Sequence, residues 1–201
     1  ITAAGKGAGT FAVHITANDL ASSGAEPIGL MSSILLPPRT REKKLRELMQ
    51  EMELACKELN IEILGGHTEV SDAVNRPVIT VTGVGKAKKG AFLSTAGLRP
   101  GDELVMTKWA GLEGTAIIAA ERKEKLLETL PGELVDTAAS FLQYLSVVPE
   151  AAIAAASGAT AMHDVTEGGI FGALWEMGAA SGVGISAELM KIPIRQETIE
   201  V

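Results

Sequence analysis

The stretch that does most to decide the fold reads AVHITANDLASSGAEP, from Ala12 to Pro27. Small and apolar residues dominate it up to Gly24, which predicts a helix from about residue 7 to 24 that ends at this glycine. Pro27 and the prolines at 37–38 bracket a short apolar run, which predicts a strand over residues 28–36. The chain is therefore expected to start with a helix that leads directly into a strand.

Two polar residues, Asn18 and Asp19, lie inside this small and apolar stretch. An unpaired carboxylate is costly to bury, and a bound cation would offset that cost. Asp19 is therefore a candidate magnesium ligand. The alternative is an ordinary acid on the surface of the helix.

A second polar run follows the apolar residues 61–64 and contains Gly65, Gly66, His67, Thr68 and Glu69. Glycines let the backbone approach a ligand closely, and the three polar side chains offer donors and acceptors at the end of a predicted strand. Ligands of α/β proteins usually bind at the carboxyl ends of strands. The run predicts a ligand site, with a tight turn around a hydrogen-bonded histidine as the alternative.

Residues 162–169, MHDVTEGG, form a third run of this kind. Asp164 follows a predicted strand at 159–163 and precedes a predicted helix at 168–180, so it is either a helix cap or a metal ligand. Carboxylates beside glycine-rich backbone suit a site where magnesium and phosphates come close.

A glycine-rich loop also opens the predicted helix at 114–122. Gly111, Gly114 and Thr115 belong to it. The free backbone N–H groups at such a position can bind anions, although most such loops only turn the chain.

The other expected elements come from hydrophobic periodicity and turn residues. They are a helix at 40–59 with Thr40 as a possible N-cap, strands at 61–64, 77–84 and 103–106, helices at 132–145 and 149–157, and a strand and helix start within 184–201. Glycines and lysines break the pattern near residues 88–100. We therefore expect two domains, residues 1–95 and 96–201.

Composition bounds the function. The chain has 201 residues, of which 46% are hydrophobic and 3% aromatic, and its net charge is -7. Because the chain is acidic and offers few aromatic side chains for base stacking, nucleic acid is not expected as a partner. No apolar run reaches the roughly 18 residues that span a bilayer, no signal peptide is visible, and Cys56 lacks a disulfide partner, so a cytoplasmic protein is expected. Because the sequence lacks an initiator Met, a fragment or a processed chain is expected.

The three polar runs together resemble the motifs of the aminoimidazole ribonucleotide synthetase (PurM-like) superfamily. Residues 12–27 are similar to its Asn-Asp and Gly-Ala-x-Pro element, residues 65–69 to its Gly-Gly-acid-Thr strand end, and residues 163–169 to its His-Asp-x-Thr-x-Gly-Gly element. The resemblance covers nearly the whole chain. It implies an amino-terminal α/β domain that forms a barrel in a homodimer, followed by a carboxyl-terminal α+β domain.

The same resemblance implies ATP bound with Mg²⁺ for phosphoryl transfer, which needs positioning and charge neutralisation more than a covalent side chain. It implies Asp19, Glu69 and Asp164 as magnesium ligands. It assigns Asn18, Gly65, Gly66, His67 and Thr68 to the nucleotide, and Gly111, Gly114 and Thr115 to a phosphate or the substrate. No side chain is assigned to chemical catalysis.

Within the superfamily the motifs are most similar to the hydrogenase maturation (HypE-like) branch. This similarity implies activation of a carbonyl or amide oxygen on a small-molecule or protein-bound acceptor, and a hydrogenase maturation partner. His67, Val165 and Glu167 depart from that branch, which has an acid, Pro and Arg there. One alternative is a kinase similar to selenophosphate synthetase or thiamine-monophosphate kinase, and another is a noncatalytic homodimeric binding or scaffold protein.

Overall fold

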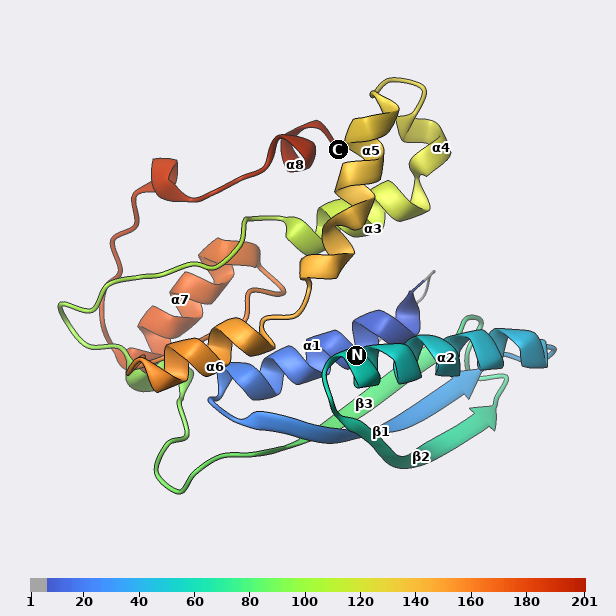
Figure 1. The fold of residues 1–201 in the computed structure, drawn as a ribbon, viewed down its shortest axis with the longest axis horizontal. Helices are drawn as coiled ribbons and strands as arrows, with labels where there is room; N and C mark the ends of the chain where they lie inside the picture. Colours follow the sequence, from blue (N-terminus) through green and yellow to red (C-terminus); the bar gives the residue numbers. More distant parts are fainter. Residues whose placement is uncertain (1–6) are drawn as a thin grey trace. The chain divides into compact units, whose positions relative to one another are not determined.

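The computed structural model describes residues 7–201, and the chain forms two compact units, residues 1–92 and 93–201. The first unit, shown in Figure 1, contains helices α1 (Ala8–Ser22) and α2 (Glu42–Glu58) and strands β1 (Glu26–Leu36), β2 (Glu62–Val70) and β3 (Val78–Lys86). The second contains α3 (Leu112–Glu121), α4 (Lys123–Leu126), α5 (Gly132–Ala139), α6 (Val148–Ala156), α7 (Gly169–Ser181) and α8 (Gln196–Glu200), with short 3-10 helices η1 (Thr95–Gly97), η2 (Ser140–Tyr144) and η3 (Leu189–Lys191).

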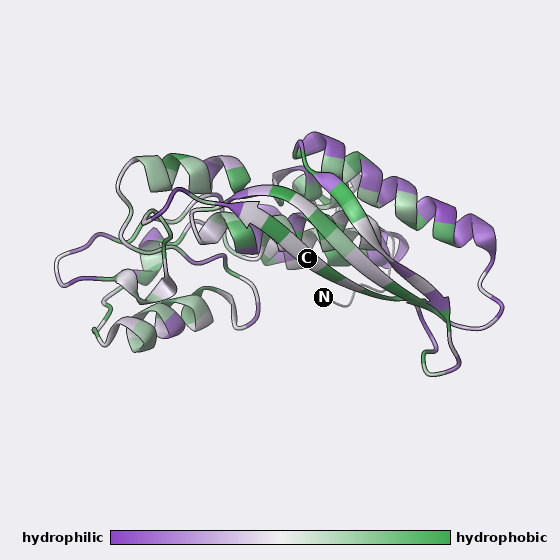
Figure 2. Ribbon diagram, turned by 90° about the horizontal axis from the view of Figure 1, so that it is seen from below, coloured by the Kyte–Doolittle hydropathy of each residue, from purple (hydrophilic) through white to green (hydrophobic). Residues whose placement is uncertain are grey.

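Strand β1 lies in the middle of a three-stranded sheet, parallel to β2 and antiparallel to β3. Helices α1 and α2 cover one face of this sheet (Figure 1). Side chains alternate across a strand, so Leu30, Ile34 and Leu36 are buried on the covered face, while Met31 and Ser33 remain exposed on the other. Figure 2 looks onto this open face, whose strands carry several hydrophobic segments.

The core of the first unit is built from aliphatic residues, as the low aromatic content requires. Leu30, Ile34, Met52 and Ile79 are each at most 1% exposed. Helix α1 packs closely on β3 because Gly83 has no side chain: a Cβ there would lie 2.7 Å from atoms of Thr16 and Leu20. The helix predicted at 7–24 and the strands predicted at 28–36 and 77–84 are confirmed to within two residues at each end.

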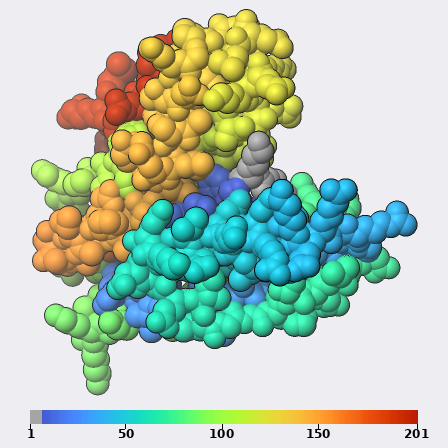
Figure 3. All heavy atoms as spheres, turned by 45° about the vertical axis from the view of Figure 1, so that its right-hand side comes forward, coloured from blue at the N-terminus to red at the C-terminus, as the bar shows by residue number. Residues whose placement is uncertain are grey.

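Helix α2 has the predicted amphipathic pattern, and its side chains form a cyan ridge across the surface of the first unit (Figure 3). Leu48, Met52 and Cys56 face the core, whereas its charged residues pair at the surface. The predicted N-cap is wrong: the cap residue is Arg41, and the Thr40 hydroxyl donates instead to the carbonyl of Pro37. The prolines hold that hydroxyl in a turn that precedes the helix.

The amino end of α1 is capped from outside the helix by Glu51 of α2. Its two carboxylate oxygens accept hydrogen bonds from Gly9 N at 3.0 Å and Gly7 N at 3.3 Å. An acid at this end of a helix satisfies free N–H groups and complements the helix dipole.

Replacing Glu51 with Ala should lower the free energy of unfolding by about 1 kcal/mol, because two backbone donors lose their acceptor. Urea denaturation would measure the change. Glu47→Ala is the control, since Glu47 only pairs with exposed Lys43 at 3.8 Å and is expected to contribute less than about 0.5 kcal/mol. Equal effects of the two substitutions would contradict the capping role.

The structure differs from the predicted strands in two places, at residues 61–69 and in the second unit. Residues 65–69 do not follow a short strand: they lie inside β2, which pairs with β1 as far as Val70. Strands were predicted at residues 103–106 and 159–163 and within 184–201, but the second unit contains no paired strand. An extended segment forms a strand only where a neighbour accepts and donates its backbone hydrogen bonds, and a sequence window does not contain that neighbour.

Among residues 7–201, no single helix has the length and apolar character needed to cross a membrane. One bent pair, Gly132–Tyr144 with Val148–Ala156, passes on length and composition alone.

Candidate functional site

The strongest candidate site lies in the second unit, in the loop between α6 and α7. The side chain of Asp164 is 12% exposed, and its Oδ2 atom is buried without a hydrogen-bond partner. A carboxylate oxygen left without a donor costs roughly 1–3 kcal/mol or more, and a bound cation removes that cost. The donor chemistry and the buried, unsatisfied oxygen therefore fit Mg²⁺.

The alternative role of Asp164 as a helix cap is wrong. The N-cap of α7 is Gly168, in the left-handed conformation with φ 80°, and no side chain caps this helix. Glycine accepts that conformation without strain and leaves the end of the helix open. Asp164 is therefore available for a different role.

His163 is held through both of its ring nitrogens. Its Nε2 lies 2.6 Å from Oε2 of Glu176, which projects from α7, and its Nδ1 lies 2.6 Å from the backbone carbonyl oxygen of Asp164. Burial alone would lower the pKa of His163. The hydrogen bonds to Glu176 and to the Asp164 carbonyl, together with the charges of both acids, raise it above its ordinary value.

This raised pKa predicts a pH dependence of stability. The folded-state pKa of His163 lies above its unfolded value of about 6.5, so the stabilisation is complete below that pH and is lost as the pH rises through the folded-state pKa. We expect the free energy of unfolding to fall over that range, and Glu176→Gln to reduce the slope. NMR titration of the His163 ring would test the cause directly. A pKa at or below the unfolded value would contradict the prediction.

Two other acids of the second unit, Glu113 and Glu167, interact through their charges. The pKa of Glu113, in the first turn of α3, is raised by burial and by the negative charge of Glu167. Glu167 belongs to the His163–Gly169 motif. Neither acid was predicted as a site residue, because nothing in a linear pattern shows that residues 113 and 167 approach each other.

The glycine-rich loop at the start of α3 is packed against a later segment of the same unit. Gly111 is the N-cap of α3, and a Cβ at this position would lie 2.8 Å from a methyl group of Thr198. The buried Thr115 hydroxyl donates to the hydroxyl of Thr198 at 3.0 Å. Gly114 has open space where a side chain would be. The role of these three residues in phosphate binding stays a prediction.

In the first unit, Asn18 is buried and Asp19 is exposed. Asp19 was expected to be buried in an apolar segment. This expectation is wrong, because the helix turns this position outward. Asp19 does not need a cation to offset a desolvation cost. Its role as a magnesium ligand stays a prediction that rests on the motif.

His67 and Glu69 lie on the open face of the sheet, with 3.5 Å between His67 Nε2 and Glu69 Oε2. They pair in register with Ser33 and Leu35 of β1, which alternate with the buried core residues. Helix α1, which carries Asp19, covers the opposite face (Figure 1). Within the first unit, Asp19 and Glu69 therefore lie on opposite sides of the sheet. Among residues 7–201, no three His, Cys, Asp or Glu side chains form a group that could hold a metal.

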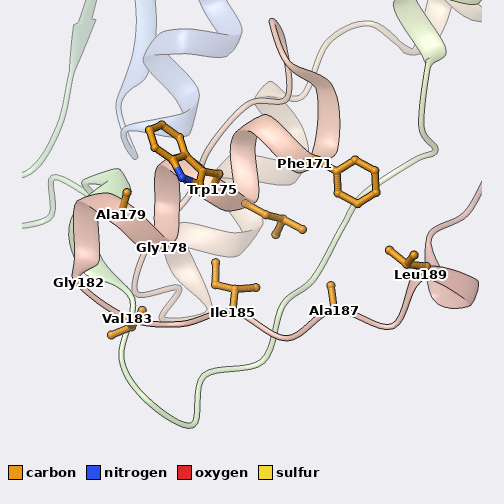
Figure 4. Close-up of a pocket in the computed structure, with 10 residues that line it drawn as sticks. Phe171, Trp175, Gly178, Ala179, Gly182, Val183, Ile185, Ala187 and Leu189 are labelled. Carbon is orange, nitrogen blue, oxygen red and sulfur yellow. The ribbon is translucent and has the colours of Figure 1, made fainter.

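The apolar face of α7 carries an open groove, shown in Figure 4. Phe171, Trp175, Ile185 and Leu189 are among its lining residues. Unlike the Asp164 loop, the groove residues labelled in Figure 4 have no charged side chain, so they offer no charged group that could bind a phosphate.

The model of the AIR synthase related protein, N-terminal domain, matches residues 2–87, and that of the C-terminal domain matches residues 99–201. Carbamoyl dehydratase HypE of Cupriavidus necator is 33% identical over 194 residues, covering 92% of this chain and 51% of that protein. The chain thus spans about half the length of this relative.

Solved structures of other proteins show the same fold. A chain of the HypE–HypF complex superposes with a TM-score of 0.80 at 25% identity, covering 99% of this chain and 63% of that one. AaThiL, solved with AMPPCP and TMP, has a TM-score of 0.80 at 20% identity, covering 95% and 59%, and shares the fold. The expected PurM-like fold class and the resemblance to the superfamily are confirmed, and the chain belongs to the AIR synthase related protein family.

Proposed function

We propose that this chain is part of an ATP- and magnesium-dependent enzyme that transfers a phosphoryl group to a carbonyl or amide oxygen, as in HypE-like hydrogenase maturation. The observation that carries the proposal is the similarity to carbamoyl dehydratase HypE over 92% of the chain. The buried, unsatisfied oxygen of Asp164 supports it independently.

Magnesium would neutralise charge on the phosphates as the phosphoryl group transfers. Asp164 is the residue best suited to hold it. Asp19 is a second proposed ligand, with Asn18 beside it to orient the phosphates. Glu69 and its neighbours on β2 would contact the nucleotide or the metal from the open face of the sheet.

Calorimetry with AMPPCP, a nonhydrolysable ATP analogue, tests the proposal. We expect the purified chain to bind AMPPCP in the presence of Mg²⁺ and to bind it at least tenfold more weakly in EDTA. Folded protein that binds no AMPPCP under either condition would contradict the proposed function and favour the noncatalytic alternative.

A kinase of the thiamine-monophosphate type is the second candidate, because AaThiL shares the fold at a TM-score of 0.80. Thiamine monophosphate added to the AMPPCP complex would discriminate between the two. Saturable binding of this acceptor would favour the kinase, and its absence would favour a carbonyl or amide acceptor. An acceptor carried by a protein partner is supported by the likeness to the HypE–HypF complex.

We also propose that the chain forms a homodimer through the part of the open face that carries Ile28, Met31 and Leu64, which leaves the end of β2 with His67 and Glu69 to the nucleotide. Ile28, Met31 and Leu64 are 39%, 44% and 53% exposed there. Exposed apolar side chains on one sheet face are typical of a surface that packs against another protein. The outer side of α2, by comparison, carries mainly charged residues, whereas the ionisable residues His67 and Glu69 share the open face with these apolar side chains.

The dimer interface gives a direct prediction. Native mass spectrometry should show a dimer for the wild type and predominantly monomer for Met31→Glu, because a buried, unpaired carboxylate would oppose association. Leu54→Glu is the matched control: Leu54 is 61% exposed but lies on α2. Loss of the dimer in both variants, or in neither, would contradict the assigned face.

A further inference from the structure

We propose that Glu176 is a positioning residue for Asp164, acting through His163. The inference rests on the proposed function, since it concerns the carboxylate to which that function assigns magnesium. Glu176 lies 12 residues away from Asp164 in the sequence, on the next helix.

The first step is that His163 connects α7 to the loop. Glu176 Oε2 lies 2.6 Å from Nε2, on one side of the ring, and the Asp164 carbonyl oxygen lies 2.6 Å from Nδ1, on the other. The ring is therefore fixed at both ends of its polar axis. The ring thereby links helix α7 to the backbone of Asp164.

The second step is that this connection fixes the backbone that carries the Asp164 carboxylate. Asp164 Oδ1 lies 3.9 Å from His163 Nδ1, and Oδ2 has no hydrogen-bond partner. His163 therefore contacts the backbone carbonyl of Asp164 and lies close to its carboxylate. The carboxylate thus keeps one oxygen free while its backbone is held, which is the arrangement a metal ligand needs.

The third step is that Glu176 itself remains outside the site. Its side chain is 51% exposed, whereas those of His163 and Asp164 are 17% and 12% exposed. It is therefore free to orient the imidazole without competing for a cation. Partners of this kind, one step removed from a metal ligand, typically change metal affinity 10–100-fold when they are replaced.

The experiment compares wild type, Glu176→Ala, Glu176→Gln and the control Glu128→Ala, which removes the same charge from an exposed position of the second unit. Hydrogen exchange is measured without metal at the amide of Gly169, which donates to the carbonyl oxygen of Thr166 at 3.1 Å and closes the loop onto α7. We expect Glu176→Ala to speed exchange at this amide at least tenfold, because the His163 ring loses one of its two anchors. Glu176→Gln should rescue most of this protection, since its amide oxygen accepts the same hydrogen bond.

Calorimetric titration of Mg²⁺ into the AMPPCP-bound protein is the second readout. We expect a 10–100-fold weaker Mg²⁺ affinity for Glu176→Ala, a smaller loss for Glu176→Gln and none for Glu128→Ala. Unchanged exchange and unchanged Mg²⁺ affinity in folded Glu176→Ala would overturn the inference, as would a fall in thermal stability alone. Failure of the wild type to bind Mg²⁺ and AMPPCP would instead contradict the proposed function, and the exchange data would still decide the positioning role.

Discussion

Gly66→Ala should abolish native pairing between β1 and β2. A Cβ at residue 66 would lie 2.0 Å from the carbonyl oxygen of Ser32, a backbone atom that cannot move away without breaking the sheet. The backbone φ of +156° is also unfavourable for an L-residue. We expect the free energy of unfolding to fall by more than about 3 kcal/mol, as for overpacking combined with backbone strain.

Gly65→Ala separates these two causes. Gly65 has nearly the same φ, +157°, but no atom lies within 4 Å of its Cβ position. Its substitution should therefore cost only the conformational part, about 1–2 kcal/mol. Urea denaturation of both variants measures the difference. If Gly66→Ala is as stable as Gly65→Ala, the close approach of β1 and β2 at Ser32 is not as the structure describes.

Asp164→Asn should change binding and stability in opposite directions. Removing the charge should weaken binding of AMPPCP with Mg²⁺ at least tenfold, or about 1.4 kcal/mol. The same change removes a buried charge that has an unsatisfied oxygen, and the lost attraction between Asp164 and His163 offsets part of this gain, so the free energy of unfolding should rise by less than about 1 kcal/mol. Sites that bind a cation commonly keep such a cost in the free protein.

Calorimetry and urea denaturation of the same samples test both parts. Asp72→Asn is the control, because Asp72 is an exposed acid in the loop between β2 and β3 and should change neither quantity. Unchanged affinity in Asp164→Asn would exclude this carboxylate as the metal ligand. Lower stability with lower affinity would indicate that the substitution disturbs the loop rather than the charge.

Local sequence patterns predicted the first unit well. Hydrophobic periodicity and the positions of Gly and Pro predicted the helix over 7–24, the amphipathic helix at 40–59 and the strands at 28–36 and 77–84. These signals act within a few residues, so a sequence window contains them. The motif Gly65–Glu69 was placed at the end of a strand because glycines usually interrupt strands. In the structure Gly66 is there because β1 comes too close for any side chain, and only the paired strand reveals this.

The candidate site was predicted in part. Asp164 was recognised from its motif, but the sequence left a cap and a metal ligand equally open. The glycine cap of α7 excludes the capping role, whereas the metal-ligand role stays a prediction that the unsatisfied Oδ2 atom supports. Glu176 was missed altogether, since a residue on a helix gives no local signal that it contacts a histidine 13 positions earlier.

The sequence by itself determined the family, the helices and the order of the three polar motifs, because these depend on residue type and short spacing. The tertiary structure decided which acids are buried, which face of the sheet carries His67 and Glu69, and which segments lack a strand partner. These properties depend on contacts between residues far apart in the chain. Burial and hydrogen bonding, rather than residue type, decide whether a carboxylate is a surface charge or a ligand.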